Sequence, residues 1–206
     1  MDNTCKSKNQ TDAERSRSVL LKPSQFEKDS RFRRNDNMED EIINRVAHSK
    51  LITFNLEDYY PEGERKVLDI ADWLYEGFIL REKEFRAHVE AHDWTAYQDA
   101  YIALQCSSDA IVPGWAFMLV ASKLQPYAKK VVQGSLQDLE TALYQPILEQ
   151  LDVTEFTDKP VIIKGCSHKP VPENAYLMAV ARIQEVAKSV MYGEACSSVP
   201  LFKRKK

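Results

Sequence analysis

The chain has 206 residues, of which 44% are hydrophobic and 29% are charged, and its formal net charge at pH 7 is −3. These values are ordinary for one soluble globular domain that folds without disulfide staples, and they give no overall attraction to nucleic acid or to an anionic membrane. No apolar run is long enough to span a bilayer and the N-terminus lacks the apolar core of a signal peptide, so we expect a cytoplasmic protein.

The N-terminal part of the chain differs in composition from the rest. Residues 1–37 are rich in Lys, Arg, Ser, Asn, Gln and Asp, and their apolar residues form no sustained period. Such a segment cannot bury enough surface to offset the entropy lost on ordering, so we expect a disordered extension in which Cys5 has no role. The acidic residues after Met38 favour the start of a helix that runs to about Ser49. Residues 38–206 are expected to form a single α/β domain.

Two strands and one amphipathic helix are predicted next. Leu51–Leu56 alternates well enough for a strand, and Val67–Ile70 is a second strand candidate. Phe78–Ala91 places apolar side chains on one side and a run of charged side chains on the other, which is typical of a helix with one solvated face. His88 and His92 have zinc-ligand spacing on this helix, but no Glu-x-x-His context supports a metal site, so we expect two exposed histidines.

From Tyr101 onwards the chain alternates between strands and helices, which is the pattern of βαβ units. Prolines stand where helices are expected to open, and glycines stand where strands are expected to end. The predicted strands are Tyr101–Leu104, Lys130–Gln133, Val161–Lys164, Ser189–Tyr192 and a short final strand, Val199–Phe202. The predicted helices are Pro113–Tyr127, Leu136–Leu151 and Pro172–Ala187.

Part of this region repeats at an offset of 59 residues. Residues 112–134 align without a gap on residues 171–193, with 8 identities in 23 positions. The match indicates duplication of one βαβ unit, and the alternative is that two amphipathic helices merely resemble each other. We therefore expect an α/β fold: a mixed, partly parallel sheet with an internal βαβ duplication in residues 101–193, packed against an N-terminal α+β portion.

Three of the four cysteines occupy similar settings. Cys106, Cys166 and Cys196 each follow a short apolar run that predicts a strand, and each lies among Ser or Gly residues rather than on an apolar face. The loop that leaves a strand of a βαβ unit lies at the carboxyl edge of the sheet, where open α/β sheets hold their ligands. A helix N-terminus stabilises anions, so the helices expected after Cys106 and Cys166 should favour the thiolate form of nearby cysteines. We expect the three thiols to meet at one edge if the strand before Cys196 is parallel.

These cysteines predict a metal site. Disulfide pairing would leave one of the three unpaired, and disulfides are rare in the cytoplasm, so free thiols are expected. Three thiolates with Asp109 or His168 would form a tetrahedral zinc shell, or would anchor an iron–sulfur cluster with one iron held by a group other than cysteine. Asp109 suits a labile cluster, whereas His168 suits a closed structural zinc.

Two other interpretations of the same residues stay open. In a thiol-dependent enzyme, Cys106 or Cys166 would be the nucleophile and His168 its base. In an interaction scaffold, the cysteines would simply pack within the structure. The cysteine spacings match no short zinc-finger or ferredoxin signature, and the chain contains no Cys-x-x-Cys pair, phosphate-binding loop or Gly-x-Ser-x-Gly motif. The three cysteine settings therefore indicate a site, but no motif in the chain names a reaction.

The chain from Met38 to its end resembles the DUF2480 family, a bacterial family of unknown function found mainly in Bacteroidetes. The motifs that carry the resemblance are Leu80–Arg86, Cys106–Ala116, Lys164–Ser167, Pro170–Pro172 and Met191–Pro200. Genes of this family often lie near genes for iron–sulfur cluster assembly. The resemblance therefore implies a role in metal or sulfur handling, with iron–sulfur assembly proteins as the expected partners.

Overall fold

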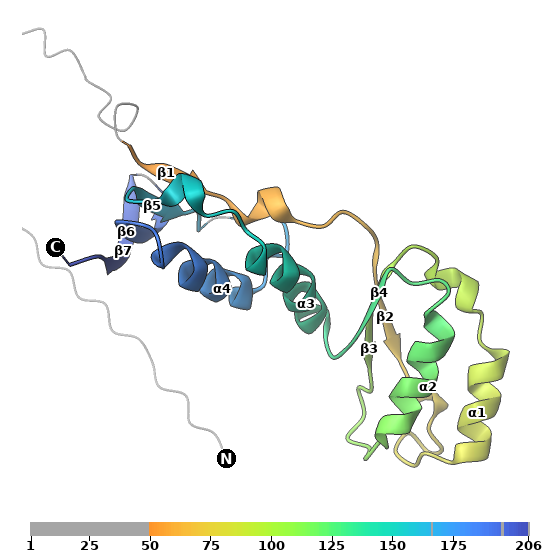
Figure 1. The fold of residues 1–206 in the computed structure, drawn as a ribbon. Helices are drawn as coiled ribbons and strands as arrows, with labels where there is room; N and C mark the ends of the chain where they lie inside the picture. The colour runs from red at the N-terminus through yellow and green to blue at the C-terminus, as the bar shows by residue number, and fades with distance from the viewer. Residues whose placement is uncertain (1–49, 166, 195, 206) are drawn as a thin grey trace, which may run out of the picture. The chain divides into compact units, whose positions relative to one another are not determined.

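The computed structural model of the chain describes residues 50–165, 167–194 and 196–205. In this part of the chain the fold is α/β, as expected, with four α-helices and with seven strands in two sheets (Figure 1). The predicted disordered extension, the helix predicted after Met38 and Cys5 lie outside the described residues. No helix among the described residues is long and apolar enough to cross a membrane.

The first sheet has three parallel strands. β2 (Arg65–Asp69) and β4 (Lys130–Gln133) flank the central strand, β3 (Tyr101–Gln105). Each strand has a short apolar centre, as parallel strands need when helices cover them. All three carboxyl ends therefore lie at the same edge of this sheet.

The second sheet has four strands. β1 (Ile52–Phe54), β5 (Pro160–Ile163) and β6 (Ser189–Glu194) are parallel in that order, and β7 (Ser197–Lys203) pairs with β6 in the antiparallel direction. The partly parallel arrangement is confirmed, but the strands are divided between two sheets instead of forming one. The reason is that β5 pairs with β1, far away in the sequence, and not with the preceding strand β4.

Three of the four helices in the described part of the chain begin where local signals place them. The four helices are α1 (Glu82–Ala91), α2 (Gly114–Leu124), α3 (Leu136–Glu149) and α4 (Glu173–Gln184). α2 and α4 follow a proline, and α3 starts at a capping box in which Ser135 and Asp138 satisfy each other's backbone N–H groups. α1 starts later than predicted because Tyr75 and Ile79 close a tight turn through a β-bridge.

The three-stranded sheet is covered on both faces. On one face, Leu139 and Leu143 of α3 pack against Ala103. On the other face, α1 and α2 cover a core that includes Leu68, Ile70, Phe85, Val89, Ile102, Leu104, Val120 and Leu124. With both faces filled, the ends of the strands are the places left for a site.

α3 and α4 supply the core of the four-stranded sheet. This core includes Phe54, Leu56, Tyr144, Leu148, Phe156, Val161, Ile163, Ala175, Ala179, Ile183 and Val190. The Tyr144 hydroxyl donates to the carbonyl oxygen of Leu56 at 3.0 Å, and burial raises the pKa of Tyr144. Because the first turns of α3 pack on the three-stranded sheet, this helix contributes to both cores.

The sequence offset of 59 residues relates elements of the two sheets. β3, α2 and β4 correspond in order and position to β5, α4 and β6, and in each group the helix connects two neighbouring parallel strands. The two groups lie in different sheets, and only the second continues into β7. The structure thus has two βαβ units at the expected positions, but Lys130–Gln133 and Ser189–Tyr192 lie in different sheets, so the predicted duplication is not confirmed.

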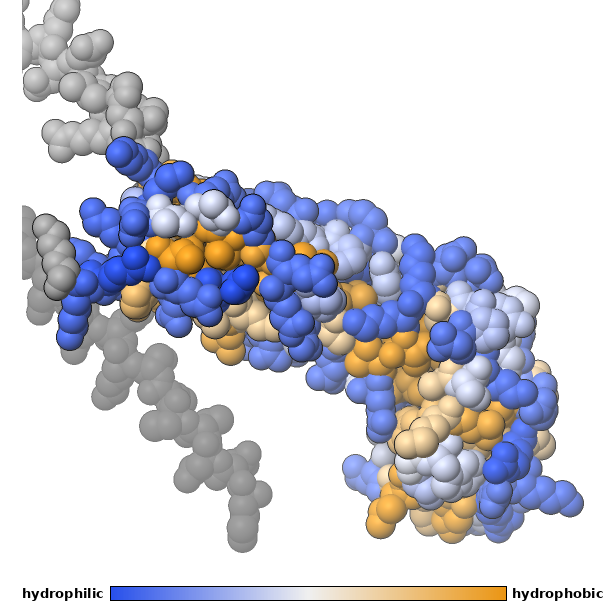
Figure 2. All heavy atoms as spheres, viewed as in Figure 1, coloured by the Kyte–Doolittle hydropathy of each residue, from blue (hydrophilic) through white to orange (hydrophobic). Residues whose placement is uncertain are grey.

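Hydrophilic residues cover much of the surface seen in Figure 2, with apolar patches between them. The large apolar side chains most exposed among the described residues are Ile111, Met118, Leu177, Val199 and Phe78. Single exposed apolar residues are normal on soluble proteins and do not by themselves mark a site.

Candidate functional site

Cys106 lies directly after β3, at the carboxyl edge of the three-stranded sheet. Its thiol is free and half-buried, and its sulfur lies 3.2 Å from Ser108 Oγ and 3.8 Å from the Ser108 carbonyl oxygen. Cys106 lines a pocket of about 320 Å³ together with Gly134 and with Ser135, which caps α3. The ends of two parallel strands and the start of a helix thus surround this thiol, in the place where open α/β sheets hold ligands.

Asp69, the last residue of β2, holds the loop that carries Cys106. Its Oδ1 accepts hydrogen bonds from the backbone N–H groups of Ala71 at 2.9 Å and Ser107 at 3.1 Å. Burial acts to raise the pKa of Asp69, but hydrogen bonds from Ser107, Ala71 and Gln105 outweigh it and keep the pKa below its usual value. The ionised carboxylate therefore fixes the backbone on which the thiol is placed.

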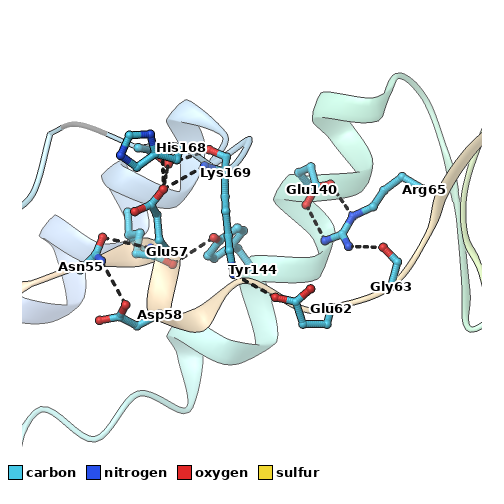
Figure 3. A network of polar contacts seen from close by, with 12 residues as sticks. Asn55, Glu57, Asp58, Glu62, Gly63, Arg65, Glu140, Tyr144, His168 and Lys169 are labelled. Atoms are coloured by element: carbon cyan, nitrogen blue, oxygen red, sulfur yellow. Dashed lines mark hydrogen bonds and ion pairs between the residues drawn. The ribbon is translucent and has the colours of Figure 1, made fainter.

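Glu57 holds the corresponding loop after β5. It lies in the short 3-10 helix η1 (Leu56–Tyr59), which follows β1. One carboxylate oxygen accepts hydrogen bonds from the backbone N–H groups of Lys169 at 2.9 Å and of His168 (Figure 3), and from the Ser167 hydroxyl at 3.2 Å. The backbone hydrogen bonds of Lys169 and then His168 lower the pKa of Glu57 to about 2, against the opposing effect of burial.

Cys196 lies in the turn between β6 and β7, where its thiol is free and exposed. Gly193, near the end of β6, has a φ of 120°, and a Cβ there would lie 2.6 Å from the Ser197 carbonyl oxygen. A Cβ at Gly165 would lie 3.0 Å from the Tyr192 ring and 3.3 Å from the Gly193 Cα. The loop after β5 and the β6–β7 hairpin therefore lie side by side at the carboxyl edge of the four-stranded sheet.

The structure groups the predicted ligands into two sets. Cys106 and Asp109 share the loop after β3, although Asp109 lines a different pocket, of about 440 Å³. His168 and Cys196 lie in loops of the four-stranded sheet. No three His, Cys, Asp or Glu side chains among the described residues are placed so that they could hold a metal ion. Cys166 lies outside the described residues, so the five-residue set stays a prediction.

The expected meeting of the thiols at one edge of one sheet needs correction. The strand before Cys196 is parallel to β5, as that expectation required. However, β3 and β5 belong to different sheets, so the edge that carries Cys106 is not the edge that carries Cys196. The sequence could not show this, because the choice of a strand's partner depends on packing between distant segments.

The enzyme interpretation required a base beside a thiol. In the described part of the chain, the hydrogen-bond partner of the Cys106 thiol is Ser108, and His168 is held through its backbone N–H by Glu57. The hydrogen bonds among the described residues include none between the His168 ring and the Cys106 sulfur. A nucleophile–base pair of Cys106 and His168 is therefore not formed in this structure, and the alternative nucleophile, Cys166, lies outside the described residues.

Sequence reasoning missed both carboxylates that anchor the loops. Asp69 is the residue that motif reading could have found, because it ends a predicted apolar strand at the edge where ligand loops gather. Glu57 had no such signal, since its partners, His168 and Lys169, lie more than a hundred residues further along the chain. Anchors of this kind become visible only when the fold brings the segments together.

A second polar group, also missed, joins β2 to α3. Arg65 Nε lies 2.8 Å from Glu140 Oε1, its Nη2 lies 3.3 Å from Oε2, and its Nη1 donates to the Gly63 carbonyl oxygen at 2.6 Å (Figure 3). The side chains of Arg65 and Glu140 are only 12% and 6% exposed. A buried, bidentate ion pair of this kind fixes the start of β2 against α3.

Comparisons with known proteins give one match. The family model described as a protein of unknown function, DUF2480, matches residues 40–204, which is most of the chain. No curated protein and no solved structure matches the chain. The family match supports the resemblance inferred from the cysteine-containing motifs, and it assigns no activity.

Proposed function

The chain belongs to the DUF2480 family, and from this premise we propose that it is an accessory protein that binds a metal ion or an iron–sulfur cluster through Cys106, Cys166 and Cys196. The observation that carries the proposal is the anchoring of the strand-exit loops. Asp69 holds the loop of Cys106, and Glu57 holds the loop that follows β5. A ligand loop that is already fixed loses less entropy when it binds a metal.

The accessibility of the thiols also supports metal binding. Cys196 is exposed and Cys106 is half-buried, and both are free. Buried inert cysteines would instead be expected in a scaffold where these residues simply pack. The thiols are thus available to an incoming metal or cluster.

We propose that the metal binds at the loops of the four-stranded sheet. Gly165, which precedes Cys166, packs against Gly193 in the hairpin that carries Cys196. We propose that Cys166 and Cys196 are the primary ligands, with His168 or solvent in the same shell. Cys106 and Asp109 would complete the site only if their loop moves or if they come from a second copy of the chain.

The test is elemental analysis and visible absorption of protein purified without oxygen. We expect bound zinc without visible absorption or, for a cluster, iron and sulfide with absorption near the bands typical of thiolate-bound clusters. Cys166→Ser and Cys196→Ser should remove most of the bound metal, whereas Cys5→Ser, the matched control, should not. His168→Asn and Asp109→Asn then decide which residue completes the shell.

The proposal fails if the triple variant of Cys106, Cys166 and Cys196 binds metal like the parent protein. It fails equally if the parent carries no metal after anaerobic purification and after reconstitution with iron and sulfide. If a cluster is bound, iron–sulfur assembly proteins are the proposed partners. Transfer of the cluster to or from such a protein, followed by circular dichroism in the visible range, tests that assignment.

A further inference from the structure

A pocket unrelated to the cysteines lies where α3 and α4 begin. Its volume is about 350 Å³, which is within the usual size range of small-molecule sites. The segment before β2 supplies Tyr60 and Arg65, the first turns of α3 supply Leu136 and Glu140, and the loop before α4 supplies Val171. Three chain segments that are distant in sequence therefore build one concavity.

The walls of this pocket are mainly apolar. Leu136 stands on one side, and Val171 stands between two prolines, Pro170 and Pro172, on the other. Leu136 lines the pocket and is 44% exposed, so its side chain is accessible to a ligand. Such walls favour an apolar body of aromatic or branched aliphatic character.

The two cations near the pocket, Arg65 and Lys169, already have hydrogen-bond or ion-pair partners. Each of the three guanidinium nitrogens of Arg65 donates a hydrogen bond, two to Glu140 and one to a backbone carbonyl oxygen. The Arg65 guanidinium also lies 4.1 Å from the centre of the Tyr60 ring. Lys169, on the same ring at 5.1 Å, is paired with Glu62 at 2.9 Å. Both cations therefore already have an acidic partner, which leaves less of their charge for an acidic ligand.

One carboxylate in the pocket lining is left for a ligand. Glu173, the first residue of α4, lines the pocket and forms no ion pair among the described residues. Gln137 of α3 adds an exposed amide to the lining. The pocket therefore combines the Glu173 carboxylate with mainly apolar walls.

We propose that this pocket binds a small apolar molecule that carries an amino group. The aromatic or branched body lies between Leu136 and Val171, and the ammonium group pairs with Glu173. This site uses none of the cysteines, so its test does not depend on the proposed metal function.

The experiment is a titration of the full-length, isotope-labelled protein followed by amide NMR. Three probes share one ring: 2-phenylethylamine, 2-phenylethanol and 3-phenylpropionate. We expect the amide signals of Leu136 and Val171 to shift with the amine at the lowest concentration, then with the alcohol, and least with the carboxylate. The proposal is overturned if the carboxylate binds as tightly as the amine, or if the amine shifts neither signal.

Two variants separate the charge from the walls. Glu173→Gln should weaken binding of the amine about threefold, the size expected for an exposed ion pair, and leave the alcohol unchanged. Leu136→Trp should fill the mouth and abolish binding of all three probes. Glu149→Gln, at the far end of α3, is the matched control. Unchanged binding of the amine in Glu173→Gln, or in a folded Leu136→Trp protein, contradicts the proposal.

Discussion

In both sheets a carboxylate holds the loop that follows a central strand. The two carboxylates come from different kinds of element. In the three-stranded sheet, the anchor is Asp69 at the very end of β2, and burial opposes its ionisation. In the four-stranded sheet, the anchor is Glu57, which a 3-10 helix after β1 presents to two backbone N–H groups and one hydroxyl. Asp69 thus ends the strand next to the loop that it holds, whereas Glu57 lies in the 3-10 helix that follows such a strand.

The two units differ in how the chain continues. After β4 the chain turns at Gly134 directly into the capping box of α3, so the Cys106 loop faces a helix start. After β6 the chain turns into β7, and Cys196 is left exposed in the hairpin. Cys106 follows the first strand of its βαβ unit and is half-buried, whereas Cys196 follows the last strand of the other unit and is exposed. The element that follows each unit, α3 in one and β7 in the other, therefore contributes to the different access of the two thiols.

The largest expected effect comes from truncating matched core residues. Leu104 and Ile163 stand 59 positions apart near the ends of the central strands, and they are 1% and 0% exposed. We expect Leu104→Ala and Ile163→Ala each to lower the free energy of unfolding by about 3 kcal/mol, because each leaves a cavity in a packed core.

Urea unfolding followed by circular dichroism measures both variants. A single shared transition is expected, since α3 packs into both cores. If only one of the two variants is destabilised, the two cores do not stabilise their units equally. If the sheets unfold in separate steps, the two cores do not form one cooperative unit.

A smaller and unequal effect is expected at a matched pair of glycines. Gly134 and Gly193 have φ values of 140° and 120°. A Cβ at Gly193 would meet the backbone oxygen of Ser197 at 2.6 Å, whereas at Gly134 it would meet the Asp138 side chain at 2.5 Å. Gly193→Ala should cost about 2–3 kcal/mol of stability. Gly134→Ala should cost somewhat less, at about 1–2 kcal/mol, because a side chain moves away more easily than backbone, although the cap is weakened.

Thermal unfolding of the two glycine variants, together with amide signals of the β6–β7 hairpin, tests this order. The hairpin signals should change in Gly193→Ala and stay unchanged in Gly134→Ala. A Gly134→Ala protein less stable than Gly193→Ala would show that the cap of α3 matters more than the hairpin.

The smallest expected effect is the response of the two anchors to acid. The folded protein holds the pKa of Glu57 at about 2, below its ordinary value of 4.5, because the ionised form accepts the backbone hydrogen bonds. The stabilisation is therefore complete above pH 4.5 and is lost as the pH falls from 4.5 towards 2. Asp69 should respond in the same direction below its ordinary value of 3.8.

The amide chemical shifts of Lys169 and Ser107 report the two carboxylates in one NMR titration. The Lys169 signal should titrate near pH 2, and Glu57→Gln should remove that step while leaving the Ser107 signal unchanged. A Lys169 signal that titrates near pH 4.5 would mean that the Glu57 hydrogen bonds do not form in solution.

Local patterns were enough to place most of the elements. The strand predicted at Lys130–Gln133 has the observed bounds, and the helices after Pro113 and Pro172 begin where the prolines indicate. The helix predicted from Phe78 was wrong at its start, because a turn at Tyr75–Ile79 used that segment. Turn geometry there depends on positive φ values at Glu76 and Gly77, which apolar periodicity does not report.

The sequence by itself determined the α/β class, the order of the elements, the repeat at an offset of 59 residues and the strand-exit settings of Cys106 and Cys196. Only the tertiary structure decided that β5 pairs with β1, that the strands form two sheets and that Glu57 and Asp69 hold the loops. The physical reason is how far apart in the sequence the interacting residues lie. Helix starts and strand ends depend on neighbouring residues, whereas strand pairing and buried hydrogen bonds depend on segments that meet only when the whole core packs.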